Sequence, residues 1–73
     1  MAKHSKDHPH SSSIQKCEYD DDANELTITF ATGSKHCFKD CPKEEYDDLN
    51  AAESKGAHFH TRIRRRYKSE KVD

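Results

Sequence analysis

Basic side chains gathered near the C-terminal end are the residues best suited to chemistry in this sequence. Residues 54–73 carry seven lysines and arginines against two carboxylates, which gives this part of the chain a net charge of +5. Guanidinium groups hold phosphate oxygens through paired hydrogen bonds as well as by charge, so such a cluster is typical of a surface that follows a nucleic-acid backbone. The candidate phosphate-binding residues are Lys55, His58, Arg62, Arg64, Arg65, Arg66 and Lys68.

Two simpler interpretations explain the same basic cluster. Cations in the last turn of a helix stabilise that helix by complementing its dipole. Alternatively, the cluster pairs with acidic residues of the same chain, because residues 1–53 carry a net charge of −6. The formal net charge of −1 therefore hides a dipolar molecule, and the acidic part of this molecule would repel DNA and disfavour indiscriminate binding.

Cysteine and histidine side chains offer a second chemistry, the coordination of zinc. Cys37 and Cys41 are four residues apart, and the nearby candidate ligands are Cys17, His36, His58 and His60. Spacing alone is a weak indication of a tetrahedral site, and the alternation of a strand turns Cys37 away from the face that carries Phe38. We expect no metal site and no cofactor, and we expect Cys17 and Cys41 to be small core residues.

The three cysteines also bear on the compartment of the protein. They are an odd number and lack the spacing of a disulfide framework. No apolar stretch follows Met1 that would serve as a secretory signal. Together these features predict reduced thiols and a cytoplasmic location.

Catalysis has little support in the sequence. Cys37 beside His36 is the only adjacent pair of a thiol and an imidazole, and neighbours on a strand point to opposite faces of a sheet. A glycine-rich loop that cradles phosphate is excluded, because the chain contains only Gly33 and Gly56. We therefore expect a protein that is not an enzyme.

The elements that must position these residues form one small domain. The chain has 73 residues, of which 30% are hydrophobic and 37% are charged, so its core must be thin. No run of about 18 apolar residues is present, which excludes a helix that spans a membrane. Three segments, 14–19, 25–31 and 35–40, have the composition of strands, and Leu26, Ile28 and Phe30 alternate with polar residues. Short turn segments join them, which predicts an antiparallel meander.

After Pro42 the apolar repeat changes from two residues to between three and four, which is typical of helices. The stripe of a first helix is Tyr46, Leu49 and Ala52, and that of a second helix is Phe59, Ile63 and Tyr67. On the second helix Arg62 and Arg64 would flank the stripe, while Arg65 would point away from it.

These elements predict an α+β fold in which a three-stranded antiparallel meander packs against two C-terminal helices (βββαα). Residues 1–10 have nothing to bury and are expected to form a disordered, histidine-containing tail. The folded domain is expected to cover residues 11–68, with a flexible C-terminus at residues 69–73. The expected core is Ile14, Cys17, Tyr19, Leu26, Ile28, Phe30, Phe38, Tyr46, Leu49, Ala52, Phe59, Ile63 and Tyr67.

The same residues resemble a known family. The segments SSSIQKCEYD, LTITF with the following Gly33, Cys41-Pro42 and YDDLNAAESKGAHFHTRIRRRY are similar to the KTSC domain, over residues 11–67. This short module occurs at the C-terminus of some lysyl-tRNA synthetases and as stand-alone bacterial and phage proteins. The sequence departs from the family at its central Tyr-x-Tyr motif, which here is His36-Cys37-Phe38. RNA binding is the usual proposal for the family.

The basic cluster and the resemblance together predict a small RNA-binding module. The arginines and Lys68 would contact phosphates of a tRNA-like RNA, and His36 or Tyr67 would contact a base. The alternative is a protein-interaction module or small inhibitor that docks through complementary acidic and basic surfaces. Self-association of these two surfaces would give a weak homodimer in place of a monomer. No membrane is expected among the partners.

Overall fold

Alternating apolar side chains form the central strands of the sheet, as the sequence predicts. Leu26 and Ile28 are fully buried on one face of the middle strand. The register sets Leu26 opposite Tyr19 on one side and Phe38 on the other. Three neighbouring strands therefore bring their apolar side chains to the same face. The strands are β2 (Ile14–Asp20), β3 (Glu25–Phe30) and β4 (Lys35–Phe38).

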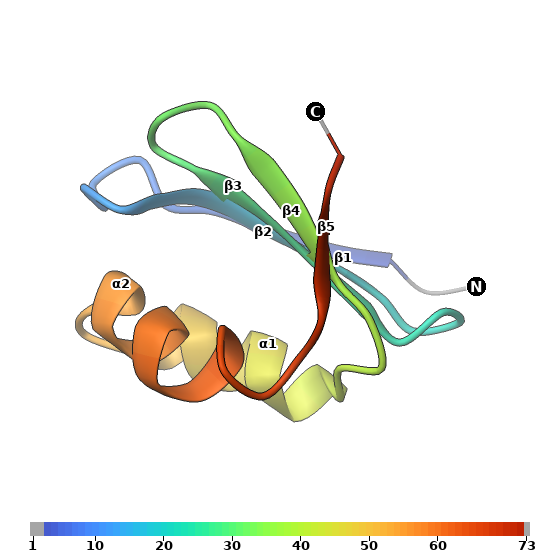
Figure 1. The fold of residues 1–73 in the computed structure, drawn as a ribbon. Helices are drawn as coiled ribbons and strands as arrows, with labels where there is room; N and C mark the ends of the chain where they lie inside the picture. Colours follow the sequence, from blue (N-terminus) through green and yellow to red (C-terminus); the bar gives the residue numbers. More distant parts are fainter. Residues whose placement is uncertain (1–2, 73) are drawn as a thin grey trace.

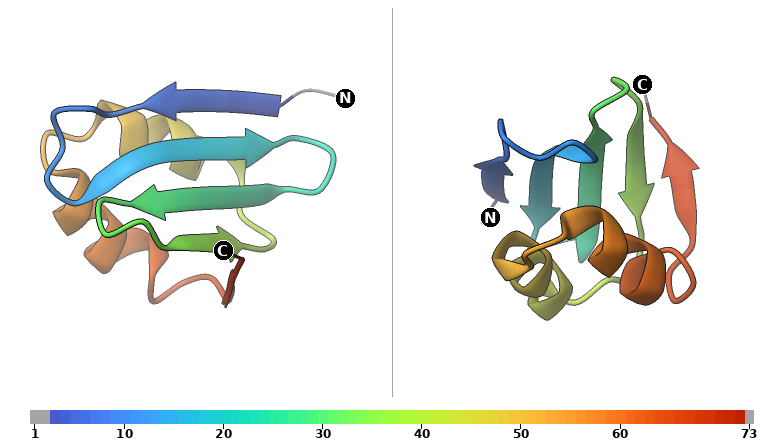
Figure 2. Two further views of the ribbon diagram at one scale, coloured as in Figure 1. Left: turned by 90° about the horizontal axis from the view of Figure 1, so that it is seen from above. Right: turned by 90° about the vertical axis from the view of Figure 1, so that its left-hand side faces the viewer.

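Within residues 3–72 the sheet has five antiparallel strands, and helices cover only one of its faces (Figures 1 and 2). The structure, a computed structural model, describes residues 3–72. The strand order follows the chain, β1-β2-β3-β4-β5, so each strand pairs with its neighbours in sequence. The two additional strands are β1 (Lys3–Asp7) and β5 (Ser69–Lys71). The α+β class was predicted correctly, but the expected number of three strands was wrong.

Strand β1 replaces part of the expected disordered N-terminal tail, and that expectation was wrong for residues 3–7. All five residues of β1 pair with β2, from Lys3 opposite Asp20 to Asp7 opposite Lys16. Opposite charges therefore face each other across both ends of the pair, which stabilises it. His4 adds a hydrogen bond to Asp21 at 2.8 Å. The first two residues of the expected tail lie outside the described residues.

Strand β5 occupies the other edge of the sheet, in a segment that was expected to be a flexible C-terminus. Its residues pair with β4, with Glu70 opposite Cys37. Glu70 also forms an ion pair with Lys39 at 3.4 Å. All side chains of β5 are exposed, so backbone hydrogen bonds to β4 define this strand rather than burial.

The first helix forms where the sequence predicts it. α1 (Lys43–Ala51) begins after Pro42, has Glu44 and Glu45 in its first turn and buries Tyr46 and Leu49. Acidic side chains at this end complement the helix dipole. Glu45 is buried as well, which the sequence analysis did not foresee.

The second helix is shorter and less regular than predicted. Ser54 caps α2 (Lys55–His58), because its side chain accepts a hydrogen bond from the Ala57 backbone. The chain then continues as a π-helix, η1 (Phe59–Ile63). The hydroxyl of Thr61 donates to the Ala57 carbonyl at 2.8 Å, the group that the Thr61 backbone would bond in an α-helix. Such a side-chain bond to a helical carbonyl loosens the α-helical ladder locally. Residues 64–66, after η1, form a turn. The expected continuation of the helix to Tyr67 was wrong.

One core lies between the sheet and the helices. Its completely or nearly completely buried residues are Ile14, Cys17, Tyr19, Leu26, Ile28, Phe38, Cys41, Tyr46, Leu49, Phe59 and Ile63. Phe30 and Tyr67 pack against this cluster and are partly buried, whereas Ala52 is only half-buried. The Tyr19 hydroxyl donates to the Cys41 carbonyl at 2.6 Å, which ties the middle of the sheet to the start of α1. No helix within residues 3–72 is long and apolar enough to cross a membrane.

A close contact between α2 and the loop before β2 requires a glycine. A Cβ atom added at Gly56 would lie 2.7 Å from Oγ and 3.0 Å from Cβ of Ser13. We expect Gly56→Ala to lower the free energy of unfolding by about 1 kcal/mol, because the destabilisation by overpacking exceeds the stabilisation from the higher helix propensity of alanine. Urea unfolding measures this change.

The control for this prediction removes the opposing side chain. Adding Ser13→Gly to the Gly56→Ala variant should recover most of the loss, because the clash then has no partner atom. Adding Ser12→Gly, at the exposed neighbouring position, should recover none of it. Equal recovery by the two second changes would contradict the proposed contact.

Candidate functional site

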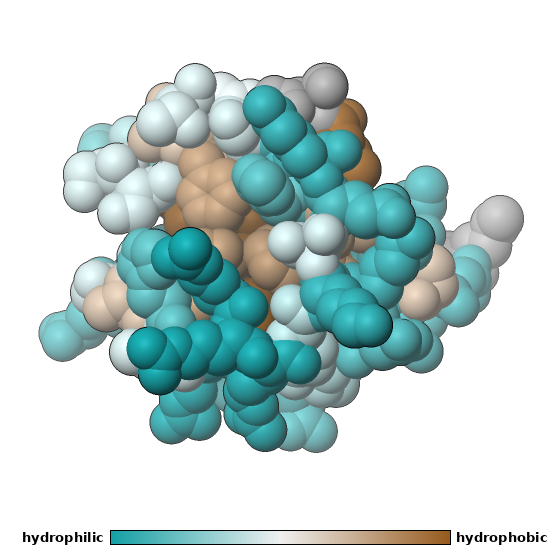
Figure 3. Space-filling view, viewed as in Figure 1, coloured by the Kyte–Doolittle hydropathy of each residue, from teal (hydrophilic) through white to brown (hydrophobic). Residues whose placement is uncertain are grey.

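Five exposed cations follow one another at the end of η1 and in the turn after it. This basic segment consists of Arg62, Arg64, Arg65, Arg66 and Lys68. Only Arg62 lies in η1, because the helix ends at Ile63. The predicted ridge of arginines along a helix face is therefore a cationic turn. Figure 3 shows strongly hydrophilic side chains crowded over the side of the molecule formed by α2 and η1.

Most cations of the basic segment have no acidic partner. Within residues 3–72, Arg66 alone of the five pairs with a carboxylate, at 3.9 Å from Glu45. Two lysine ion pairs, those of Lys39 with Glu70 and of Lys43 with Asp47, involve cations outside the basic segment. Internal pairing with the acidic first helix thus accounts for one arginine. Complementing a helix dipole accounts for Arg62 in the last turn of η1 and for Arg64 at its end, but not for the cations farther along the chain.

Lys55 and His58 lie on α2, apart from the basic segment. The Lys55 ammonium donates to the carbonyl of Ala52 at 2.9 Å and so satisfies the end of α1. His58 is half-buried, and its Nε2 atom is enclosed without a hydrogen-bond partner in the described part of the chain. These polar groups are turned inward in this structure, so the geometry supports them less than it supports the arginines.

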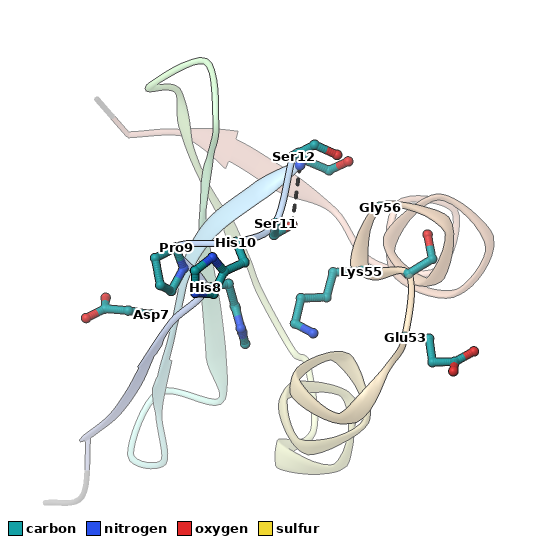
Figure 4. A pocket seen from close by; sticks show the side chains of 11 residues that line it. Asp7, His8, Pro9, His10, Ser11, Ser12, Glu53, Lys55 and Gly56 are labelled. Atoms are coloured by element: carbon teal, nitrogen blue, oxygen red, sulfur yellow. Dashed lines mark hydrogen bonds between the residues drawn. The ribbon is translucent and has the colours of Figure 1, made fainter.

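Lys55 also lines a cavity of about 510 Å³. Figure 4 shows Lys55 reaching into the space between α1 and the loop that carries His8 and His10, while Glu53 points outward. His8 is hydrogen-bonded to Asn50 at 2.7 Å. The lining thus mixes imidazoles and an ammonium with the carboxylates of Asp7 and Glu53, and both His8 and Lys55 already have hydrogen-bond partners inside the protein.

Tyr67 follows the cationic turn and is tied to α1. Its hydroxyl donates to Glu45 Oε2 at 2.9 Å. Burial, followed by this hydrogen bond to a carboxylate, raises the pKa of Tyr67 to about 12. Glu45 is only 6% exposed and accepts contacts from both Tyr67 and Arg66. Glu45 therefore positions the basic segment, a role for which the sequence analysis had no signal beyond its place in the first helical turn.

His36 lies at the rim of a smaller, aromatic cavity of about 260 Å³. Six residues line this aromatic cavity: Phe30, His36, Phe38, Phe59, Arg64 and Ser69. Phe38 and Phe59 are nearly fully buried, whereas Phe30 and His36 are partly exposed. Figure 3 shows the apolar opening between the sheet and the helices, with hydrophilic groups around it. Sequence reasoning singled out His36 but missed the neighbouring rings of Phe30 and Phe59.

The similarity to known proteins agrees with this geometry. The sequence model of the KTSC domain family matches residues 10–67. The chain belongs to the KTSC domain family. The predicted resemblance is therefore confirmed. A similar solved structure is the crystal structure of a KTSC domain protein from Yersinia pestis, with a TM-score of 0.88 and 25% sequence identity. The match covers 99% of this chain and 100% of that chain, so it includes the segments of β1 and β5. No curated protein matches the sequence.

The thiols of this KTSC domain are buried and apart from the basic segment. Cys17 and Cys41 are completely buried, as the sequence predicts, and Cys37 is 8% exposed. Burial raises the pKa of Cys17 and of Cys41 to about 12. Within residues 3–72, no three histidine, cysteine, aspartate or glutamate side chains are placed to hold a metal ion.

Proposed function

We propose that this KTSC domain is a non-enzymatic binding module that holds RNA through its basic segment. The observation that carries the proposal is the group of four exposed cations, Arg62, Arg64, Arg65 and Lys68, which have no carboxylate partner in the described part of the chain. Unpaired guanidinium groups on a surface turn are free to form paired hydrogen bonds with phosphate oxygens.

The distribution of charge supports a directed encounter with an anionic partner. The acidic turn at residues 20–22 joins β2 to β3 at the end of the sheet away from α2 (Figures 1 and 2). A phosphate backbone would be attracted to the basic side and repelled from this turn. The dipolar charge therefore favours one orientation of the nucleic acid on the domain.

The state of the thiols supports a binding role over covalent catalysis. Cys17 and Cys41 are buried and hold their protons far above neutral pH. A neutral, inaccessible thiol is a poor nucleophile. The exposed part of the basic segment carries guanidinium and ammonium groups, which bind and orient phosphates.

The proposal predicts a salt-dependent RNA complex. Titration of isotope-labelled protein with tRNA and with a DNA duplex should shift the backbone amide signals of residues 62–68. Arg64→Gln with Arg65→Gln should weaken RNA binding and reduce the slope of log affinity against log salt by about 0.7 to 0.9 for each lost phosphate contact. Binding measured at several salt concentrations gives this slope.

A matched control keeps the same change in charge at a different place. Lys6→Gln with Lys16→Gln removes two cations from β1 and β2, toward the edge of the sheet opposite to β5 and the basic segment. This variant should bind RNA with a slope close to that of the unmodified protein. Equal losses in the two double variants would contradict binding through the basic segment. Flat spectra with both nucleic acids would overturn the proposal and favour the protein-interaction alternative.

A further inference from the structure

The aromatic cavity opens next to the basic segment. Arg64 belongs to both, since it lines the cavity and is one of the four unpaired cations. The rings of Phe30 and Phe59 meet edge to face at 5.1 Å, and those of Phe38 and Phe59 at 5.4 Å. An apolar site for a flat group therefore adjoins a site for anions.

We propose that the aromatic cavity takes one unpaired base of a single-stranded RNA whose phosphates lie on the basic segment. This inference rests on the proposed RNA binding and names the kind of RNA. Nearly buried Phe38 and Phe59 form the floor of the site, and Phe30 and His36 form its wall. Sequence-tolerant binding of single strands commonly combines aromatic rings for stacking with cations for the backbone.

The size and rim of the cavity fit a base. Its volume of about 260 Å³ lies below the roughly 300–1,000 Å³ of pockets for drug-sized ligands, so it suits one ring system rather than a longer ligand. The His36 ring stands edge to face with Phe30 at 5.4 Å, at the half-exposed side. The imidazole and the Ser69 hydroxyl offer hydrogen bonds to base edges, and the Arg64 guanidinium can stack on a base.

The charge around the cavity argues for a nucleotide over an apolar peptide side chain. Arg64 at the rim and Arg62 and Arg65 beside it in the chain all lack acidic partners within residues 3–72. A base is joined to a phosphate within the same nucleotide, so one ligand satisfies both the rings and the cations. Paired bases of a duplex stay stacked within it, so single strands should be preferred.

The test compares oligouridylate with an abasic oligonucleotide of the same length, which keeps the phosphates and lacks the bases. The full-length protein should bind oligouridylate about 5- to 100-fold more tightly than the abasic strand. His36→Ala should remove most of this difference without changing the salt slope. His36→Phe should restore much of it, because a ring again stands beside Phe30. Lys35→Ala, at the exposed position before His36, is the control.

The outcomes separate this inference from the proposed function. Equal, salt-dependent binding of both strands would overturn the base site and leave RNA binding through phosphates in place. A base-dependent affinity that neither His36→Ala nor Phe30→Leu reduces would also overturn the assignment to this cavity. Binding of neither strand would overturn both proposals. The amide spectrum of each variant shows that its fold is retained.

Discussion

The free energy of unfolding is expected to fall steeply above pH 9, by about 1.4 kcal/mol per pH unit for each fully buried thiol. Cys17 and Cys41 are completely buried in the core, where desolvation raises the pKa of each thiol from 9.0 to about 12. Tyr67, whose pKa is raised from 10.0 to about 12, adds to the loss at higher pH.

The sign of this effect follows from proton binding in the two states. Below pH 9 both states keep their thiol protons, and the stabilisation from neutral buried thiols is fully present. Between pH 9 and 12 the unfolded chain loses these protons while the folded protein keeps them, so rising pH favours unfolding. Two thiols remove about 3 kcal/mol per pH unit, and a single small core supplies only about 3–5 kcal/mol. The domain should therefore unfold before pH 12.

Denaturant unfolding from pH 7 to pH 11 under reducing conditions measures this loss. Cys41→Ala should lower the free energy of unfolding at neutral pH. It should also reduce the slope of this free energy against pH by about 1.4 kcal/mol per pH unit, because the unfolded chain then has one thiol proton fewer to release. Ile28→Val is the matched control, since it weakens the same core without an ionisable group. Its curve should run parallel to that of the unmodified protein. Parallel curves for Cys41→Ala as well would refute the role of the thiol.

The central strands, which bury one face, could be predicted from the sequence, whereas the edge strands could not. Leu26, Ile28 and Phe38 carry the apolar alternation that identifies β3 and β4. Backbone hydrogen bonds hold the edge strands in place, such as those from His8 N to the Gln15 carbonyl at 2.8 Å and from Val72 N to the Lys35 carbonyl at 3.0 Å. Their side chains are mostly exposed, so the segments carry no periodic signal for pairing.

The composition of the candidate site was predictable, but its shape was not. The arginines can be identified by counting charged residues along the chain, because this count depends on the sequence alone. Their placement in a turn follows from the end of η1 at Ile63, which no residue spacing in the sequence marks. The aromatic cavity joins Phe30 of β3 and His36 of β4 to Phe59 and Arg64 at the two ends of η1, and only the folded chain brings these strands and η1 together. Such contacts between distant residues leave no spacing to detect.

Replacing Tyr67 with phenylalanine is expected to lower the free energy of unfolding by about 1–3 kcal/mol. The Tyr67 hydroxyl is 2.9 Å from a carboxylate oxygen of Glu45, which is 6% exposed. Without this hydroxyl the buried carboxylate keeps, among the described residues, the longer contact to Arg66 at 3.9 Å. A buried charge that loses a donor bears its full desolvation penalty.

A double-mutant cycle isolates this contact. Tyr67→Phe and Glu45→Gln are measured singly and together by urea unfolding, and the coupling between the two positions should be about 0.5–3 kcal/mol. Glu44→Gln is the control, because Glu44 is exposed in the same helical turn, and it should change stability by less than about 0.5 kcal/mol. Additive effects at positions 45 and 67 would contradict the coupling.

The same variant separates positioning of the basic segment from direct contact with RNA. Glu45 holds Tyr67 and Arg66 against α1, so it fixes the turn that carries the unpaired arginines. Tyr67→Phe keeps every cation and should leave the salt slope of RNA binding unchanged, because the slope reports the number of phosphate contacts. Its affinity should nevertheless fall several-fold, since a looser turn must be ordered on binding. A reduced slope would instead show that the turn loses phosphate contacts when the tie to Glu45 is weakened.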